Sequence, residues 1–171
     1  MKKILVVYWP ERGNVESCAI KIKAAFGQEA ELKSLKQLTD TDLKECDLLV
    51  AGCSTVGAET WKDASGENQW SLFLVSETSK FLSGKKVALF GLGDQVSYPN
   101  HYVDFMGILK KEMERKGALI VGRWPAVGYK FESSEALEGD HFVGLALDED
   151  WQPELTDERI SRWVDQLKKE I

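Results

Sequence analysis

The sequence predicts an α/β fold, a doubly wound parallel sheet with helices on both faces. Short apolar runs rich in β-branched residues alternate with amphipathic stretches, and parallel neighbouring strands need such crossover helices between them. The chain has 171 residues, of which 43% are hydrophobic and 29% charged. This composition excludes disordered and fibrous chains, and the length fits a single domain over residues 1–171.

The first predicted elements are a strand, a loop and a helix. Lys3–Tyr8 is an apolar, β-branched run, as expected of a strand buried on both faces of a sheet. Apolar residues recur at helical spacing over Val15–Phe26, and Gly27 supplies the stop. Ala30–Leu35 is a weaker strand candidate, and Asp47–Gly52 is the second buried strand.

A long loop separates these elements from the next group. Cys53–Gln69 is polar and rich in Gly, Ser and Thr, and loops of this length are more often functional than accidental. Apolar residues at helical spacing then predict helices over Trp70–Phe81 and Tyr102–Met113, with a strand at Lys86–Gly91 between them.

The last part of the chain breaks the alternation. Strands are expected at Ala118–Gly122 and Phe142–Leu147. The irregular stretch Arg123–Gly139 between them is therefore predicted to be an insertion near the final strand. An amphipathic helix closes the chain, with Thr156 as its expected N-cap.

Charge and cysteine content exclude several classes of function. The 28 acidic and 22 basic residues give a formal charge of −6, which disfavours nucleic acid and anionic membrane as partners. The acidity is uneven, because residues 131–158 hold ten Asp or Glu and no Lys or Arg. Three cysteines without C-x-x-C spacing, and no signal-like or membrane-spanning segment, predict a reduced, cytoplasmic protein without membrane contact.

No catalytic or metal site can be predicted from the side chains. His101 and His141 lie far apart and near no pair of cysteines, so metal binding is not expected. No Ser-His-Asp or Cys-His arrangement is recognisable.

Three predicted loops leave the carboxyl ends of strands, where open α/β sheets bind their ligands. They span residues 9–15, 53–70 and 91–101. The first leads into a helix at Asn14, whose unpaired N–H groups favour an anion such as phosphate. The third joins Gly91 and Gly93 to Asp94 and Tyr98. Each loop alone fits a plain connection, whereas together they predict a site for a flat, phosphorylated cofactor.

Motifs in the second half of the sequence resemble those of a known family. They are Gly91-Leu92-Gly93-Asp94-Gln95 with Tyr98, Gly122-Arg123-Trp124-Pro125 with Gly128-Tyr129, and His141-Phe142-Val143-Gly144-Leu145-Ala146-Leu147-Asp148-Glu149-Asp150. These motifs are similar to those of long-chain flavodoxins, and the similarity extends over essentially the whole chain. It implies a flavodoxin-like sheet of five parallel strands with the long-chain insertion near the last strand. It also implies non-covalent FMN binding and single-electron transfer between redox enzymes, without substrate turnover.

The resemblance assigns roles to residues of the third loop and the last motif. Tyr98 would stack on the outer face of the isoalloxazine ring. Asp94 and the backbone near Gly91 and Gly93 would contact the polar edge of the ring. Asp150 would approach the ribityl chain. Carboxylates beside the ring make it harder to reduce to an anion, which is the expected source of a low potential.

The loop after the second buried strand would meet the other face of the ring and its N5 region. The residues concerned are Ser54, Thr55, Val56 and Gly57. Val56 stands where many family members place an inner stacking Trp, and Trp9 and Trp61 are the candidates to replace it.

The phosphate loop departs from the family pattern T/S-x-T-G-x-T. The aligned run is Pro10-Glu11-Arg12-Gly13-Asn14-Val15, which keeps none of the three hydroxyls. Pro10 also removes a backbone donor, and Glu11 adds a negative charge. Gly13, Asn14 and the helix N-terminus remain, and Arg12 is a candidate charge-assisted phosphate ligand. The alternative to an FMN electron carrier is therefore a flavodoxin-like binding or regulatory module that has lost or weakened FMN binding.

The acidic residues 131–158 admit two interpretations. Solvated surface charge is the default. In a flavodoxin, negative charge near the cofactor would orient encounters with basic docking faces of a reductase and an acceptor. We therefore expect a monomer whose association with redox partner proteins is sensitive to salt.

Overall fold

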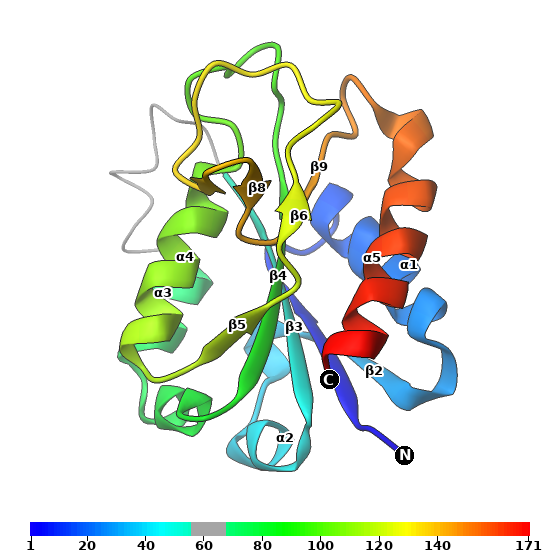
Figure 1. Ribbon diagram of the computed structural model, residues 1–171. Helices are drawn as coiled ribbons and strands as arrows, with labels where there is room; N and C mark the ends of the chain where they lie inside the picture. The colour runs from blue at the N-terminus through cyan, green and yellow to red at the C-terminus, as the bar shows by residue number, and fades with distance from the viewer. Residues whose placement is uncertain (56–67) are drawn as a thin grey trace.

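The computed structural model describes residues 1–55 and 68–171 and shows one sheet between two layers of helices (Figure 1). The parallel strands run in the order β2-β1-β3-β4-β5, and β9 also pairs with β4. The strands are β1 (Ile4–Tyr8), β2 (Ala30–Ser34), β3 (Leu48–Ser54), β4 (Lys86–Leu92), β5 (Leu119–Val121) and β9 (Leu145–Leu147). The predicted doubly wound sheet is confirmed, and its strand order reverses between β1 and β3.

Helices cover both faces of the sheet (Figure 1). Helices α1 (Asn14–Phe26) and α5 (Thr156–Glu170) lie on one face, and α3 (Gln69–Val75) and α4 (Asp104–Arg115) lie on the other. Single 3-10 turns are η1 (Gly27–Glu29), η2 (Leu35–Gln37) and η5 (Pro153–Leu155), and η4 (Glu77–Leu82) is longer. The short α2 (Asp40–Glu45), which the apolar pattern did not predict, begins with a capping box between Thr39 and Asp42. Among the described residues no helix is long and apolar enough to cross a membrane.

Burial explains the strand sequences. Every residue of β1 is buried, as are all of β3 except its last residue, because helices cover both faces of these central strands. The edge strand β2 is only partly buried. The predicted stripe of α1 is confirmed, since Val15, Cys18, Ile22 and Phe26 all face the core, and Gly27 ends the helix with a φ of 79°.

The helix predicted over Trp70–Phe81 is interrupted. It ends at Val75, and the chain resumes as the 3-10 segment η4 after an extended Ser76. Hydroxyl groups compete here with the helical hydrogen bonds, because the Ser76 Oγ donates to the Phe73 carbonyl at 2.6 Å and Ser79 Oγ donates to the Ser76 carbonyl at 2.8 Å.

Two predicted helix starts were also wrong. Tyr102 lies before α4, because Val103 has a left-handed φ of 47° and the helix begins only at Asp104. Thr156 is the first residue of α5 and does not cap it, since its hydroxyl donates to the Glu149 carboxylate instead.

Two separate strands, β5 and β9, pair with β4 at the edge of the sheet, and the insertion lies between them in the chain. Strand β5 pairs with the beginning of β4 and β9 with its end, while the chain between them forms a small antiparallel sheet in the order β6-β8-β7. Its strands are β6 (Trp124–Pro125), β7 (Leu137–Glu138) and β8 (His141–Phe142). The predicted strand Phe142–Leu147 therefore breaks before Leu145. Gly144 permits this passage, because a Cβ atom there would lie 2.1 Å from the Leu89 carbonyl oxygen.

Candidate functional site

Three loops surround a hollow at the carboxyl ends of β1, β3 and β4, beside the reversal of strand order. The register places these ends together, with Tyr8 opposite Gly52 and Ser54 opposite Leu92. The hollow has a volume of about 280 Å³. The residues that line it are Pro10, Gly13, Asn14, Val15, Ser54, Thr55, Leu92, Gly93, Asp94, Tyr98, Glu149 and Asp150.

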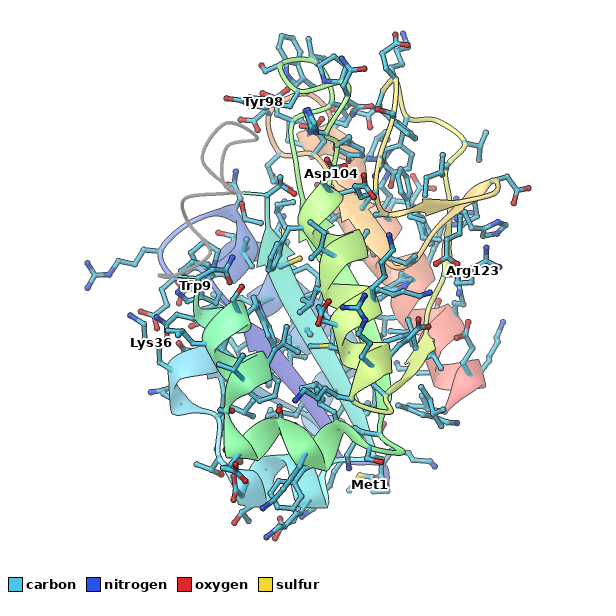
Figure 2. All side chains as sticks on the ribbon, turned by 90° about the vertical axis from the view of Figure 1, so that its left-hand side faces the viewer. Met1, Trp9, Lys36, Tyr98, Asp104 and Arg123 are labelled. Carbon is cyan, nitrogen blue, oxygen red and sulfur yellow. The ribbon has the colours of Figure 1, made fainter. Side chains whose placement is uncertain are left out.

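Most residues predicted for the site therefore lie around one hollow, but four described ones do not line it. Gly91 is buried in β4, where a Cβ would lie 3.1 Å from Met106, so it serves close packing against α4. Trp9 is half-buried against the core, and Figure 2 shows it apart from Tyr98. Glu11 and Arg12 are exposed beside the hollow. Val56, Gly57 and Trp61 lie outside the described residues.

Sequence reasoning missed Leu92 and Glu149. Glu149 stands between Asp148 and Asp150 in the motif that resembles the flavodoxin family, so that motif could have identified it as a site residue. Its carboxylate accepts hydrogen bonds from the Thr156 hydroxyl and the Cys18 thiol, which tie it to α5 and α1.

Glutamate side chains hold the loop between β1 and α1. The Tyr8 hydroxyl donates to Glu16 Oε1 at 2.6 Å, and the Arg12 N–H donates to Glu16 Oε2 at 2.9 Å. The bond to Glu16, together with burial, raises the pKa of Tyr8 to about 12, and these two hydrogen bonds lower the pKa of Glu16. The Glu11 carboxylate accepts from the Ser34 hydroxyl on β2. The carboxylates of Glu11 in the loop and Glu16 in the first turn of α1 thus have protein partners.

The N-terminus of α1 faces the hollow. In the described part of the chain, the N–H groups of Asn14 and Val15 have no hydrogen-bond acceptor. A Cβ atom at Gly13 would meet nothing within 4 Å, so open space lies directly in front of this helix end. A ligand group that accepts hydrogen bonds fits this space.

Asp94 shapes the loop after β4. Its Oδ1 accepts hydrogen bonds from the N–H of Val96 at 3.1 Å, the N–H of Ser97 at 2.7 Å and the Trp151 indole at 2.8 Å. Burial opposes ionisation, but these hydrogen bonds outweigh it and lower the pKa of Asp94. The loop presents Tyr98 at the hollow with 38% of its surface exposed, which gives the hollow an accessible aromatic rim. Trp151, 53% exposed, is tied to the same loop through Asp94.

A buried carboxylate, Asp148, joins this loop to the end of β9. Asp148 Oδ2 accepts from the backbone and side-chain nitrogens of Gln95 at 3.0 and 2.9 Å, and Oδ1 accepts from the N–H of Asp150 at 3.0 Å and Trp151 at 2.9 Å. Gln95 in turn accepts from the backbone N–H of Lys130 in the insertion. One network therefore positions three segments around the hollow.

The wall of the hollow is acidic. Asp94, Glu149 and Asp150 line it, and no Lys or Arg is among its lining residues in the described ranges. Burial, followed by the charges of Asp94, Asp148 and Glu149, raises the pKa of Asp150. The hollow is thus suited to a polar, aromatic ligand more than to an anionic one.

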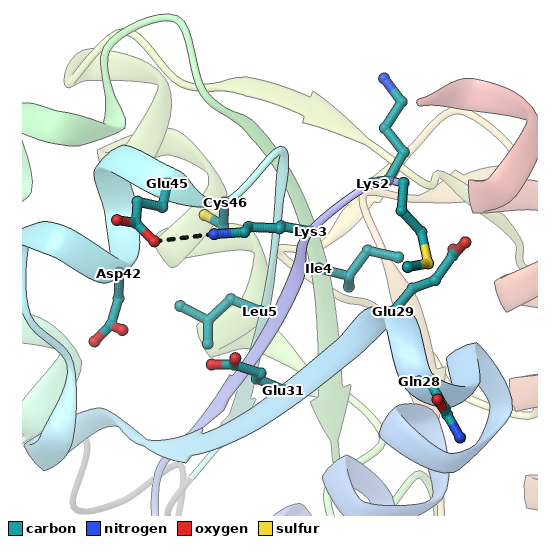
Figure 3. Close-up of a pocket in the computed structure, with 11 residues that line it drawn as sticks. Lys2, Lys3, Ile4, Leu5, Gln28, Glu29, Glu31, Asp42, Glu45 and Cys46 are labelled. Carbon is teal, nitrogen blue, oxygen red and sulfur yellow. Dashed lines mark hydrogen bonds and ion pairs between the residues drawn. The ribbon is translucent and has the colours of Figure 1, made fainter.

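A second hollow, of about 310 Å³, lies at the opposite end of the sheet (Figure 3). It borders the start of β1 and the end of α2, where Lys3 Nζ pairs with Glu45 Oε2 at 3.0 Å. It contains none of the predicted site residues. Within residues 1–55 and 68–171, no group of His, Cys, Asp and Glu side chains is arranged to hold a metal ion.

Comparison with known proteins identifies the family. The family model described as Flavodoxin matches residues 6–163. The chain belongs to the flavodoxin family. Among curated flavodoxins, that of Synechococcus elongatus is 40% identical, and the alignment covers 100% of this chain and 99% of the relative. The flavodoxin of Klebsiella pneumoniae is 38% identical, with coverages of 100% and 96%.

Solved flavodoxin structures share the fold. Fusobacterium nucleatum flavodoxin bound to flavin mononucleotide superposes with a TM-score of 0.77 at 25% identity, covering 100% of this chain and 99% of that one. A mutant of the same flavodoxin, also bound to flavin mononucleotide, gives a TM-score of 0.80 at 25% identity, with coverages of 100% and 98%. The flavodoxin-like sheet predicted from the motifs is confirmed.

Proposed function

We propose that this chain binds FMN non-covalently in the hollow at the carboxyl ends of β1, β3 and β4, and carries single electrons between redox enzymes. The observation that carries the proposal is the convergence of three flavodoxin loops on one hollow, with an aromatic rim at Tyr98 and open space before α1. The flavin-bound Fusobacterium nucleatum flavodoxin supports the choice of cofactor.

Different residues of the hollow would contact different parts of the flavin. Tyr98 offers a ring face for stacking. The Gly93 carbonyl and the Asp94 N–H, which have no partner among the described residues, offer polar groups for the edge of the flavin. Ser54 and Thr55 line the other side. Thr55 is held in place because its hydroxyl accepts from the Phe105 N–H at 3.1 Å and its own N–H donates to the Leu92 carbonyl.

The acidic wall sets the redox character. When bound, FMN supplies the one-electron chemistry. Asp94, Glu149 and Asp150 place negative charge in the hollow, which disfavours any further negative charge and so favours a low reduction potential. No side chain takes part in substrate turnover under this proposal, in keeping with the electron-transfer role of flavodoxins.

We also infer that the redox partners present basic docking faces to a monomeric, cytoplasmic protein. The insertion brings acidic residues beside the aromatic rim, because the backbone of Glu132 donates to the Pro99 carbonyl at 2.7 Å, next to Tyr98. Exposed Asp150 lies at the hollow itself. Opposite charges on a partner would accelerate encounter and place it over the hollow.

Flavin titration tests the proposed function. Apo-protein is mixed with FMN, and flavin fluorescence, absorbance after gel filtration and stoichiometry are measured. We expect quenched fluorescence and one flavin per chain. Colourless protein that leaves FMN fluorescence unchanged would contradict the proposal and favour the binding or regulatory module.

Stopped-flow reduction tests the docking inference. The rate constant for association with a purified flavodoxin reductase should fall severalfold as ionic strength rises from about 0.02 to 0.5 M, because salt screens attraction between the acidic rim and a basic face. An association rate that is independent of salt would contradict electrostatic steering while leaving FMN binding untouched.

A further inference from the structure

We propose that this site discriminates poorly between FMN and riboflavin, because the flavin is held through its ring and ribityl chain while the phosphate adds little affinity. The inference rests on the proposed function and concerns the ligand specificity of the same hollow. It follows from the donors, the charges and the ring contacts that the site offers.

The loop between β1 and α1 offers no hydroxyl donor to a phosphate. No hydroxyl side chain occurs in residues 9–16, and Pro10 has no N–H. The Arg12 N–H already donates to Glu16 Oε2 at 2.9 Å. The donors that remain at the hollow are the N–H groups of Gly13, Asn14 and Val15 and the side-chain amide of Asn14, which have no acceptor among the described residues.

The charges of the hollow oppose a phosphate. A phosphate monoester carries about −1.5 to −2 charges at pH 7. Three carboxylates, those of Asp94, Glu149 and Asp150, line the hollow, and no lining residue in the described ranges is basic. Arg12, the nearest sequence candidate for a cationic ligand, is exposed and does not line it. The positive end of α1, equivalent to about half a charge, offsets only part of this repulsion.

The contacts available to the ring do not depend on the phosphate. Tyr98, Gly93 and Thr55 come from the loops after β3 and β4, and the Asp148 network holds the Tyr98 loop through Gln95. Riboflavin carries the same ring and ribityl chain as FMN without the charge. Riboflavin lacks the contacts of the phosphate, but it also avoids the repulsion between the phosphate and the three carboxylates. The two differences offset each other.

Paired titrations test the inference on the full-length apo-protein. Riboflavin and FMN are each titrated at pH 7.5 by fluorescence quenching and by calorimetry. We expect the Kd for riboflavin to exceed that for FMN by less than about twentyfold, within the range of one or two weak contacts. A larger ratio would overturn the inference and leave the proposed function standing. Binding of neither flavin would contradict both proposals.

Two variants test which groups of the loop before α1 and its first turn affect phosphate binding. Val15→Thr keeps the branched shape and adds a hydroxyl in the first turn of α1, where the side chain lines the hollow. Because Val15 is also buried against the core, urea unfolding of the variant is measured alongside the titrations. We expect FMN affinity to rise about tenfold with riboflavin affinity unchanged, whereas Val75→Thr, exposed on α3, should change neither. In Arg12→Ala the ratio of the two Kd values should stay constant. A tenfold loss of FMN affinity alone in that variant would show that Arg12 binds the phosphate and would overturn the inference.

Discussion

Replacing Asp148 by Asn tests whether its carboxylate organises the site. The side chain is fully buried and accepts four hydrogen bonds, two on each oxygen. An Asn side chain has the same shape but only one oxygen, so whichever way it turns, its NH₂ group faces two donors. Either Gln95 or the pair Asp150 and Trp151 then loses its acceptor.

The size of the effect follows from this count. Two hydrogen bonds to a charged acceptor are lost, at about 1.5–3 kcal/mol each, and buried donors remain unpaired. Removal of a buried charge offsets part of the loss. We therefore expect Asp148→Asn to lower the free energy of unfolding by about 3 kcal/mol. Flavin affinity should fall at least tenfold, since both loops that Asp148 joins border the hollow.

Urea unfolding of the apo-protein measures the stability change, and fluorescence titration measures the affinity. The matched control is Asp165→Asn, an exposed residue of α5, which should change the free energy of unfolding by less than about 0.5 kcal/mol. If the two variants differ in stability by less than about 1 kcal/mol, Asp148 does not organise the loops as argued.

Three further changes test other contacts. Gly107→Ala places a Cβ atom 2.1 Å from the Glu135 carbonyl oxygen of the insertion. The free energy of unfolding in urea should therefore fall by at least about 2 kcal/mol, and an unchanged unfolding midpoint would refute this close packing. The hydrogen bond from Tyr8 to Glu16 raises the pKa of the phenol to about 12, so its stabilisation is present below pH 10 and is lost as the pH rises from 10 to 12. Over that window the free energy of unfolding of the wild type should fall relative to that of Tyr8→Phe. Parallel curves of unfolding free energy against pH would contradict the hydrogen bond. Gly13→Ala meets no protein atom within 4 Å, so stability should change by less than about 0.5 kcal/mol. FMN affinity should fall by no more than about tenfold, because the phosphate before α1 adds little affinity, and a larger loss would contradict that weak contribution.

The local pattern predicted most of the regular elements. Apolar strands that are buried on both faces and helices with one apolar stripe are repeated features, so β1, β3, β4, α1 and α5 could be identified to within one or two residues at their ends. Breaks in these elements were harder to predict. The interruption at Ser76 depends on hydroxyl groups competing for carbonyls, and the left-handed Val103 depends on how the preceding loop packs.

The site, like the fold, was predicted only in part from the sequence. Glycine-rich and aromatic motifs predicted which loops leave the carboxyl ends of the strands, because chain order alone implies that location in a doubly wound sheet. Which residues reach the hollow depends on side-chain partners. Glu11 and Glu16 bond to Ser34 and Tyr8, contacts between segments that no spacing rule connects.

The sequence by itself determined the fold class, the family resemblance, the acidic region and the loss of hydroxyls from the phosphate loop. Only the tertiary structure decided how that loop is used. It shows that the Arg12 N–H is taken by Glu16, that Glu149 joins Asp94 and Asp150 in the wall, and that no cation lines the hollow in the described ranges. The physical reason is that hydrogen bonds and charges act through space, between atoms that the folded chain brings together from distant positions.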